Sequence, residues 1–341
     1  MTNAEMLNAT ARAMVAEGKG ILAVDETSPT CTRRFAGLGI ESTEESRRAY
    51  RGMLFTAPGV SEYLSGAILF DETIRQSSAG NRTFVDVLNA SGIMPGIKVD
   101  TGTKPLAGAP GETVTEGLDG LRGRLEEYRE MGARFTKWRA VINVGVDLPS
   151  RSGIEANAHA LARYAALAQE TGLVPIVEPE VLMDGEHDIR RCREVTEAVL
   201  HAVFGQLISQ GCLLEGMILK PNMVTSGRQC SSWAGAAEVA EQTLEALRRC
   251  VPAAVPGIAF LSGGQTGEEA CENLNAMVSG SALPWKLTFS FGRALQYPAL
   301  PTWGGKPENF PAAQSALLHR ARMSSLAATG AYSPEMEQGA G

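Results

Sequence analysis

The chain has 341 residues, of which 44% are apolar and 20% are charged, and its formal net charge is -7. This composition is typical of an ordinary globular protein that is long enough for one large barrel-type domain or two smaller ones. The acidic balance argues against a general surface for nucleic acid or anionic membranes, although a local basic pocket for phosphate is compatible with it. We therefore expect no nucleic-acid partner and no membrane partner.

The six cysteines are scattered and form no Cys-x-x-Cys pair, which is typical of a reducing compartment. The first twenty residues have a helical rhythm and lack the charged-then-apolar layout of a signal peptide. No apolar run approaches the length needed to span a membrane. These features predict a cytoplasmic protein.

Short apolar runs alternate with helical segments along the chain, after a helical N-terminus. The runs lie at 20–24, 66–70, 95–100, 135–141, 173–180, 216–219, 257–261 and 287–290. The helical segments lie at 43–54, 82–89, 117–131, 154–170, 188–208, 236–249, 268–277 and 312–328, and Ser28-Pro29 reads as a turn.

Eight such strand-helix units favour a closed (β/α)8 TIM barrel, with an open doubly wound sheet as the alternative. The glycine-rich phosphate loops of open-sheet proteins, G-x-G-x-x-G and G-x-x-x-x-G-K-[ST], are missing from the sequence. We expect a single barrel domain over 1–332 and a short mobile tail over 333–341.

The run at 216–219 ends in Lys220, and Pro221 then stops the strand. A lysine at the end of a buried strand is unusual, because burial disfavours the ammonium form and pushes the amine toward its neutral, nucleophilic state. That state is the one that forms a Schiff base with a carbonyl. The alternative is a lysine whose stem packs on the core while its head reaches water.

Charged residues end most of the other runs as well. In a closed barrel the carboxyl ends of the strands converge on one face, and alternate residues point inward. This alternation would gather cations and carboxylates in one pocket, although a strand-end salt bridge remains the alternative for each residue by itself. The cations are Lys98, Lys137, Arg139, Lys220 and Arg293, and the carboxylates are Asp25, Glu178 and Glu180.

This mixture of charges suits carbon-carbon bond cleavage beside a carbonyl. A second cation such as Lys137 would lower the pKa of Lys220 by like-charge repulsion, and Glu178 could relay the protons of imine formation. Asp25 would then be the base for the departing hydroxyl. The sequence thus predicts a lysine-dependent aldolase chemistry.

Two later strand ends have the character of a phosphate pocket. Ser262-Gly263-Gly264 offers backbone N–H groups and a hydroxyl, and Phe291-Gly292-Arg293 brings a guanidinium beside a glycine. Barrels commonly build a phosphate site after strands seven and eight. A tight turn is the alternative for the glycine pair.

A zinc ion would be the other way to polarise a ketone. The four histidines, however, show no H-x-x-x-H or H-E-x-x-H pairing, and three of them lie in helical segments. We expect neither a metal nor any other cofactor.

Ordered motifs along nearly the whole chain resemble those of class I fructose-bisphosphate aldolases, the Schiff-base type with a (β/α)8 barrel. The motifs include GKGILAVDE (18–26), GIKVD (96–100), KWR (137–139), VPIVEPE (174–180), EGMILKPNMV (215–224), FLSGGQ (260–265) and LTFSFGRALQ (287–296). The resemblance implies reversible cleavage of fructose 1,6-bisphosphate to dihydroxyacetone phosphate and glyceraldehyde 3-phosphate, in glycolysis or gluconeogenesis. It also implies a metal-independent homotetramer.

The resemblance implies a role for each matching residue. The family's Schiff-base lysine matches Lys220, and its acid/base for the carbinolamine matches Glu178. The carboxylate that acts on the hydroxyl of the cleaved bond matches Asp25, and the neighbouring active-site lysine matches Lys137. Glu180 would support the lysines. The family's binding site for the phosphate near the ketone matches Ser262, Gly263, Gly292 and Arg293. Its binding site for the far half of the sugar and the second phosphate matches Thr30, Arg34 and Lys98. Another cation of the family's pocket matches Arg139.

Two places depart from the family pattern. Pro29-Thr30 stands where the family has Gly-Ser, which keeps a hydroxyl but stiffens the loop near the second phosphate. Eukaryotic members end in a tyrosine that helps to move the dihydroxyacetone-phosphate proton, whereas the last tyrosine here, Tyr332, matches an internal position. We expect slower enamine protonation and a changed preference between the bisphosphate and fructose 1-phosphate.

Two other functions fit part of the sequence. One is a Schiff-base aldolase or transaldolase that acts on another phosphosugar. The other is a catalytically retired barrel that serves as a binding or scaffold protein, which the intact set of lysines and carboxylates argues against.

Overall fold

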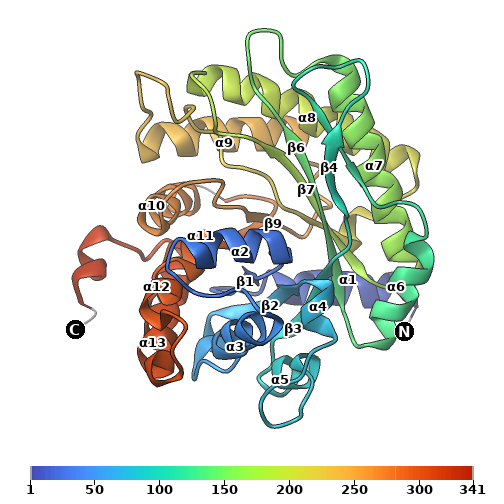
Figure 1. Ribbon diagram of the computed structural model, residues 1–341. Coiled ribbons are helices and arrows are strands. Elements are labelled where there is room, and N and C mark those ends of the chain that lie inside the picture. Colours follow the sequence, from blue (N-terminus) through green and yellow to red (C-terminus); the bar gives the residue numbers. More distant parts are fainter. Residues whose placement is uncertain (1, 281, 340–341) are drawn as a thin grey trace.

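The computed structural model describes residues 2–280 and 282–339, and eight parallel strands in it close into a barrel surrounded by helices (Figure 1). Around the barrel the order is β1, β2, β3, β6, β7, β8, β9 and β10, which pairs again with β1. The strands are β1 (Gly20–Ala23), β2 (Leu64–Leu69), β3 (Met94–Lys98), β6 (Phe135–Ile142), β7 (Val174–Val181), β8 (Ile218–Leu219), β9 (Gly257–Phe260) and β10 (Lys286–Phe291). The predicted closed barrel is confirmed, and each of the eight apolar runs overlaps one of its strands.

Helices follow the strands on the outside of the barrel, as the alternation of the sequence predicted (Figure 1). The α-helices are α1 (Asn3–Met14), α2 (Ser28–Ala36), α3 (Glu44–Phe55), α4 (Asp71–Ile74), α5 (Phe84–Ala90), α6 (Leu121–Glu130), α7 (Arg151–Glu170), α8 (Ile189–Ser209), α9 (Ala236–Cys250), α10 (Gly267–Val278), α11 (Arg293–Gln296), α12 (Ala299–Trp303) and α13 (Phe310–Ala328). Short 3-10 helices are η1 (Val60–Glu62), η2 (Leu214–Gly216), η3 (Pro307–Asn309) and η4 (Pro334–Gly339).

The amino-terminal end of the barrel is closed by side chains. Helix α1 packs apolar residues against the barrel interior, and a Cβ added at Gly257 would lie only 2.6 Å from Val15. The ring of Phe135 occupies the space that side chains at Gly66 and Gly96 would need, since added Cβ atoms would approach it to 2.9 and 2.2 Å. The charged residues therefore meet only at the opposite, carboxyl-terminal end.

Two elements near that end differ from the sequence-based expectation. The predicted turn at Ser28-Pro29 is wrong, because these residues begin helix α2. Proline is well tolerated in the first turn of a helix, where its missing N–H would have no partner within the helix. An antiparallel hairpin, β4 (Gly102–Pro105) and β5 (Thr113–Glu116), also follows β3 where the sequence indicated a connection.

The tail carries the short helix η4, which is tied to α13 by Glu337. Both carboxylate oxygens of Glu337 accept hydrogen bonds of 2.6 Å from Arg320, a guanidinium that is only 2% exposed. The Tyr332 hydroxyl donates to the same carboxylate at 2.9 Å, and the ring Nε2 of His319 lies 2.9 Å from it. Mobility of this tail and a domain boundary at residue 332 stay predictions.

Candidate active site

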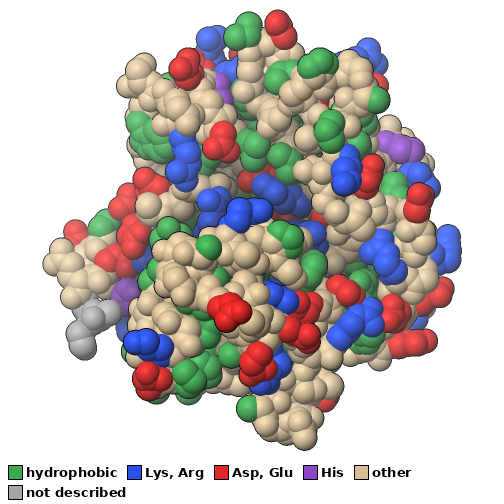
Figure 2. Space-filling view, in the orientation of Figure 1, with side chains coloured by type: hydrophobic (Ala, Val, Ile, Leu, Met, Phe, Trp, Pro, Cys, Tyr) green, Lys and Arg blue, Asp and Glu red, His purple; other side chains and the backbone are tan. Residues whose placement is uncertain are grey.

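Every predicted site residue lines one pocket of about 650 Å³ at the carboxyl ends of the strands. Figure 2 shows Lys and Arg side chains gathered in a hollow of this face. The pocket receives Lys220, Glu178, Asp25, Lys137, Glu180, Ser262, Gly263, Gly292, Arg293, Lys98, Arg139, Arg34 and Thr30. The strand ends, the segments that follow β9 and β10, and helix α2 together supply these residues.

Lys220 follows the two-residue strand β8 and is 3% exposed. Its backbone N–H donates to the carbonyl of Val177 at 2.8 Å, and Pro221 after it ends the ladder because proline has no N–H to donate. Burial lowers the pKa of the Lys220 ammonium, and the positive charge of Lys137 adds to this, although Glu178 opposes it. The amine is therefore easier to deprotonate than an ordinary lysine.

Lys137, on β6, lies between two carboxylates. Its Nζ is 2.6 Å from Asp25, just after β1, and 3.1 Å from Glu178, on β7. Burial alone would lower the pKa of Lys137, but the charges of Asp25 and Glu178 outweigh it and raise that pKa. The two lysines therefore have opposite pKa shifts, and Lys137 is the one that stays charged.

The two carboxylates are held as anions by the same lysines. Burial alone would raise the pKa of Asp25, but Lys137 and Lys220 lower it to about 2. Lys137 and Lys220 likewise hold the pKa of Glu178 below its usual value against the opposing effect of burial. Glu178 lies between the lysines, with its second oxygen 3.4 Å from Lys220. Glu178 is thus positioned to exchange a proton directly with Lys220.

A second set of ion pairs surrounds this centre. Lys98 on β3 is 2.9 Å from Asp100, whose other oxygen accepts the backbone N–H of Arg139 at 3.2 Å. The Arg139 guanidinium is ion-paired with Glu180. Burial alone would lower the pKa of Arg139, but Glu180 and then Glu178 raise it. Glu180, which the resemblance implied would support the lysines, thus contacts the Arg139 guanidinium.

The predicted phosphate pocket combines a loop and a guanidinium. Gly263 has a φ of +64°, a left-handed conformation that favours glycine. Its carbonyl accepts a hydrogen bond of 2.8 Å from Arg293, the first residue of α11. Burial and then the nearby positive charge of Arg34 lower the pKa of Arg293. An anion bound here would relieve that repulsion.

Helix α2 supplies the other cations of the pocket. Arg34 is 2.6 Å from Glu26, and the Thr30 hydroxyl is 3.1 Å from that of Thr27. Arg33 also lines the pocket but was missed in the sequence, because Pro29 was interpreted as a turn. Had 28–36 been recognised as a helix with proline in its first turn, the spacing of residues 30, 33 and 34 would have placed them on one face.

Sequence reasoning also missed Ser290, on β10. This residue lines the pocket and is 1% exposed, and its hydroxyl has no hydrogen-bond partner within the described part of the chain. Strand parity could have identified it, because Ser290 precedes Gly292 by two positions and so faces the same side.

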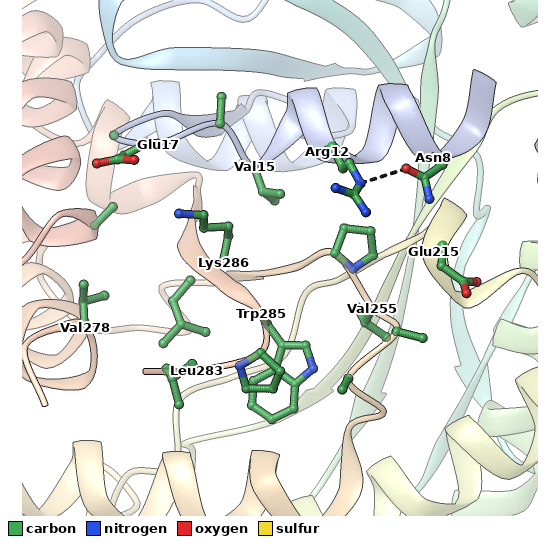
Figure 3. A pocket seen from close by; sticks show the side chains of 18 of the residues that line it. Asn8, Arg12, Val15, Glu17, Glu215, Val255, Val278, Leu283, Trp285 and Lys286 are labelled. Atoms are coloured by element: carbon green, nitrogen blue, oxygen red, sulfur yellow. Dashed lines mark hydrogen bonds between the residues drawn. The ribbon is translucent and has the colours of Figure 1, made fainter. Parts of the chain in front are cut away.

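A second cavity, of about 720 Å³, lies near α1 and the start of β10 (Figure 3). Arg12, Trp285 and Lys286 are among its lining residues, and it contains none of the predicted site residues. Across 2–280 and 282–339, no group of three or more His, Cys, Asp or Glu side chains is arranged to hold a metal. None of the helices in these ranges is long and apolar enough to cross a membrane.

Comparisons with known proteins agree with this geometry. A family model for class I fructose-bisphosphate aldolase matches residues 6–341. A probable fructose-bisphosphate aldolase class 1 from Xanthomonas axonopodis pv. citri is 58% identical over 96% of this chain and 98% of its own. The cytosolic fructose-bisphosphate aldolase 6 of Arabidopsis thaliana is 53% identical over 99% of this chain and 94% of its own.

A solved structure gives the same result for the fold. Fructose-bisphosphate aldolase from Plasmodium falciparum, in complex with TRAP and a small-molecule inhibitor, superimposes with a TM-score of 0.96 at 47% identity, covering 97% of this chain and 96% of that one. Enzymes of this family are lyases that cleave fructose 1,6-bisphosphate through a lysine Schiff base. The chain therefore belongs to the class I fructose-bisphosphate aldolases.

Proposed function

We propose that Lys220 is the Schiff-base lysine of this aldolase and that Glu178 moves its protons. The observation that supports this assignment is that one buried carboxylate contacts both lysines, with Lys220 at 3.4 Å and Lys137 at 3.1 Å. Since the pKa of Lys220 is lowered and that of Lys137 is raised, Lys220 is the better nucleophile of the two.

Imine formation then proceeds within this cluster. The Lys220 ammonium gives a proton to Glu178, and the neutral amine attacks the ketone carbon of the open-chain sugar. Glu178 returns the proton to the carbinolamine hydroxyl, which leaves as water, and a protonated imine remains. Lys137 stays charged throughout and holds Glu178 and Asp25 in place. The positive imine nitrogen is the electron sink that the next step requires.

Asp25 acts in the bond-breaking step. With its pKa lowered to about 2, this carboxylate is ionised at neutral pH and can accept the proton of the hydroxyl on the carbon that becomes the aldehyde carbon when the bond breaks. The carbon-carbon electron pair moves to the imine and forms an enamine, while the other half leaves as an aldehyde. Protonation of the enamine carbon and hydrolysis of the imine release the ketone product and restore Lys220.

The two ends of the pocket would hold the two phosphates. Backbone N–H groups of the Ser262-Gly263 loop and the Gly292-Arg293 segment suit the phosphate near the ketone. Thr30, Arg34 and Lys98 would hold the far half of the sugar and its second phosphate, and Arg139 adds a cation between the two ends. A bisphosphate would thus span the Lys220 centre.

The assembly and location of the enzyme are finer parts of this proposal. We expect a homotetramer, which sedimentation equilibrium would test by a mass four times that of the chain. A cytoplasmic location agrees with the cytosolic Arabidopsis relative, although another relative, from Chlamydomonas reinhardtii, is chloroplastic. A fluorescent fusion in the source cell would distinguish the two locations.

Borohydride trapping tests the lysine assignment. Reduction of the protein with dihydroxyacetone phosphate, followed by peptide mass mapping, should place one adduct on Lys220 and none on Lys137. Lys220→Met should abolish the adduct, whereas Lys286→Met, which removes an exposed lysine at the start of β10, should not. An adduct on Lys137 or Lys98 in the unmodified enzyme would overturn the assignment.

A further inference from the structure

Helix α2 carries much of the far-phosphate end of the pocket, yet it has few apolar contacts. Only Cys31 and Phe35 of this helix are buried, and the Phe35 ring packs edge-on against Tyr50 and Trp303 at centroid distances of 5.7 Å. A helix with so narrow an apolar contact needs other contacts to fix its rotation about its own axis.

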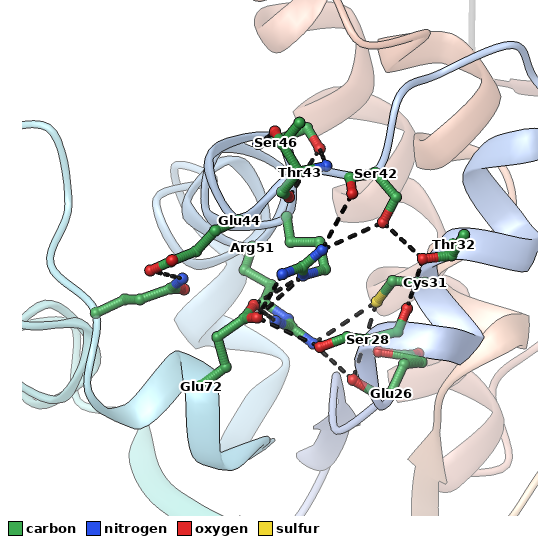
Figure 4. Close-up of polar contacts among 12 residues, drawn as sticks. Glu26, Ser28, Cys31, Thr32, Ser42, Thr43, Glu44, Ser46, Arg51 and Glu72 are labelled. Carbon is green, nitrogen blue, oxygen red and sulfur yellow. Dashed lines mark hydrogen bonds and ion pairs between the residues drawn. The ribbon is translucent and has the colours of Figure 1, made fainter.

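A cluster of three charged residues supplies these contacts from outside the pocket (Figure 4). The Glu72 carboxylate, on α4, accepts a forked pair of hydrogen bonds from Arg47 and one of 3.1 Å from Arg51, both on α3. The Ser28 hydroxyl, at the start of α2, donates to the same carboxylate at 3.3 Å. None of the three charged residues lines the pocket. We call Glu72, Arg47 and Arg51 the Glu72 cluster.

The Glu72 cluster continues into the pocket through Arg51, which is 1% exposed. Its other amino group donates to the backbone carbonyl of Glu26 at 2.6 Å, just before α2 begins. The carboxylate of Glu26 in turn accepts from Arg34 at 2.6 Å. Charge-assisted hydrogen bonds therefore connect Glu72 to Arg51, Arg51 to the backbone of Glu26, and the Glu26 carboxylate to the pocket cation Arg34.

The Glu72 cluster contacts one face of α2, and another face of this helix lines the pocket. Arg47 donates to the Ser42 hydroxyl at 3.3 Å, and that hydroxyl accepts from Thr32 at 2.9 Å. Ser28 and Thr32 are four residues apart and so lie on one side of the helix, whereas Thr30 and Arg34 line the pocket. A small rotation of α2 would move its pocket-lining side chains together.

We propose that the Glu72 cluster fixes the rotation of α2 and thereby gives the enzyme its preference for a ketose with a second phosphate over one without it. This inference rests on the proposed function, in which α2 holds the far phosphate. The end near the ketone has a contact outside the cluster, because the Gln296 amide of α11 donates to the Ala23 carbonyl at 2.6 Å. The same amide group also donates to the Glu26 carboxylate at 2.8 Å and accepts from the Tyr50 hydroxyl of α3 at 3.0 Å. Glu72 and its arginines are thus positioning residues for one end of the substrate.

The test compares fructose 1,6-bisphosphate with fructose 1-phosphate in steady-state kinetics. Glu72→Gln should raise KM for the bisphosphate about tenfold, as expected for a misplaced charged contact, and should change KM for the monophosphate less than about twofold. The double variant Ser28→Ala/Thr32→Val removes the two hydroxyl contacts of α2 but keeps the contact of Arg51 with Cys31, and it should shift the same ratio by about threefold. Glu45→Gln is the control, because Glu45 pairs on the surface of α3 with Arg48.

Arg34→Ala distinguishes a failure of the far-phosphate assignment from a failure of the positioning inference. If this variant leaves the ratio of the two KM values unchanged, the far-phosphate assignment is wrong and the positioning inference falls with it. If Arg34→Ala changes the ratio while the double variant, folded by thermal melting, does not, only the positioning inference is overturned. Equal losses on both substrates in the Glu72 and Ser28/Thr32 variants would also overturn it.

Discussion

Replacing Lys137 by methionine would test the electrostatic origin of the nucleophile. In the native cluster Lys137 repels the Lys220 ammonium and neutralises two carboxylates, Asp25 and Glu178. Without that charge, Lys220 becomes the cation between these carboxylates. Both changes favour its protonated form, so the pKa of Lys220 should rise.

The size of the shift follows from the geometry. The two Nζ atoms lie 3.1 and 3.4 Å from the two oxygens of Glu178. The ammonium groups are therefore at most about 9 Å apart and repel each other by about 2 kcal/mol at an effective dielectric constant of about 20. The pKa of Lys220 should rise by at least about one unit in Lys137→Met, since each unit corresponds to about 1.4 kcal/mol.

Single-turnover trapping would measure the shift. Borohydride adduct formation with dihydroxyacetone phosphate is followed between about pH 6 and pH 10, and the midpoint of the profile is compared, because the midpoint does not depend on the overall rate. Lys286→Met serves as the control and should leave the midpoint in place. A midpoint in Lys137→Met that is unchanged, or that moves to lower pH, would refute the reasoning.

Glu178→Gln should lower kcat by about a hundredfold or more and slow imine trapping, because the proton relay is lost; trapping at the native rate would contradict the assignment. Glu337→Gln should lower the free energy of unfolding by roughly 1 to 3 kcal/mol in denaturant melts while kcat is retained, because buried Arg320 loses its close carboxylate. The exposed Glu335→Gln is its control. Incubation with EDTA should leave cleavage unchanged, and a chelator-sensitive rate would indicate a metal step.

The barrel and its polar centre could be predicted from the sequence because both depend on local alternation. Strand parity placed Glu178 two residues after Ile176, and the same period brought Lys137 and Lys98 to the same end of the barrel. The observed register sets Lys98 opposite Lys137 on neighbouring strands. Every strand of the closed sheet has this two-residue alternation, so the residues that face the pocket could be identified from the sequence.

Other features could not be predicted because they depend on distances between elements. The sequence suggested that Lys137 would lower the pKa of Lys220, but only the geometry shows that Asp25 and Glu178 raise the pKa of Lys137 itself. The partner of Glu180 depended likewise on the position of Arg139. For α2, the local signal was misread, since Pro29 suits both a turn and the first turn of a helix.

The phenyl ring that fills the amino-terminal end of the barrel has a consequence for how this enzyme can change. Because Phe135 takes up the space beside both Gly66 and Gly96, a methyl group at Gly96 has no room unless a smaller side chain replaces Phe135. Gly96→Ala should be disruptive alone and better tolerated together with Phe135→Leu. Positions in this layer are therefore epistatic, and a mutagenesis library that varies one residue at a time would reject replacements that a paired library accepts.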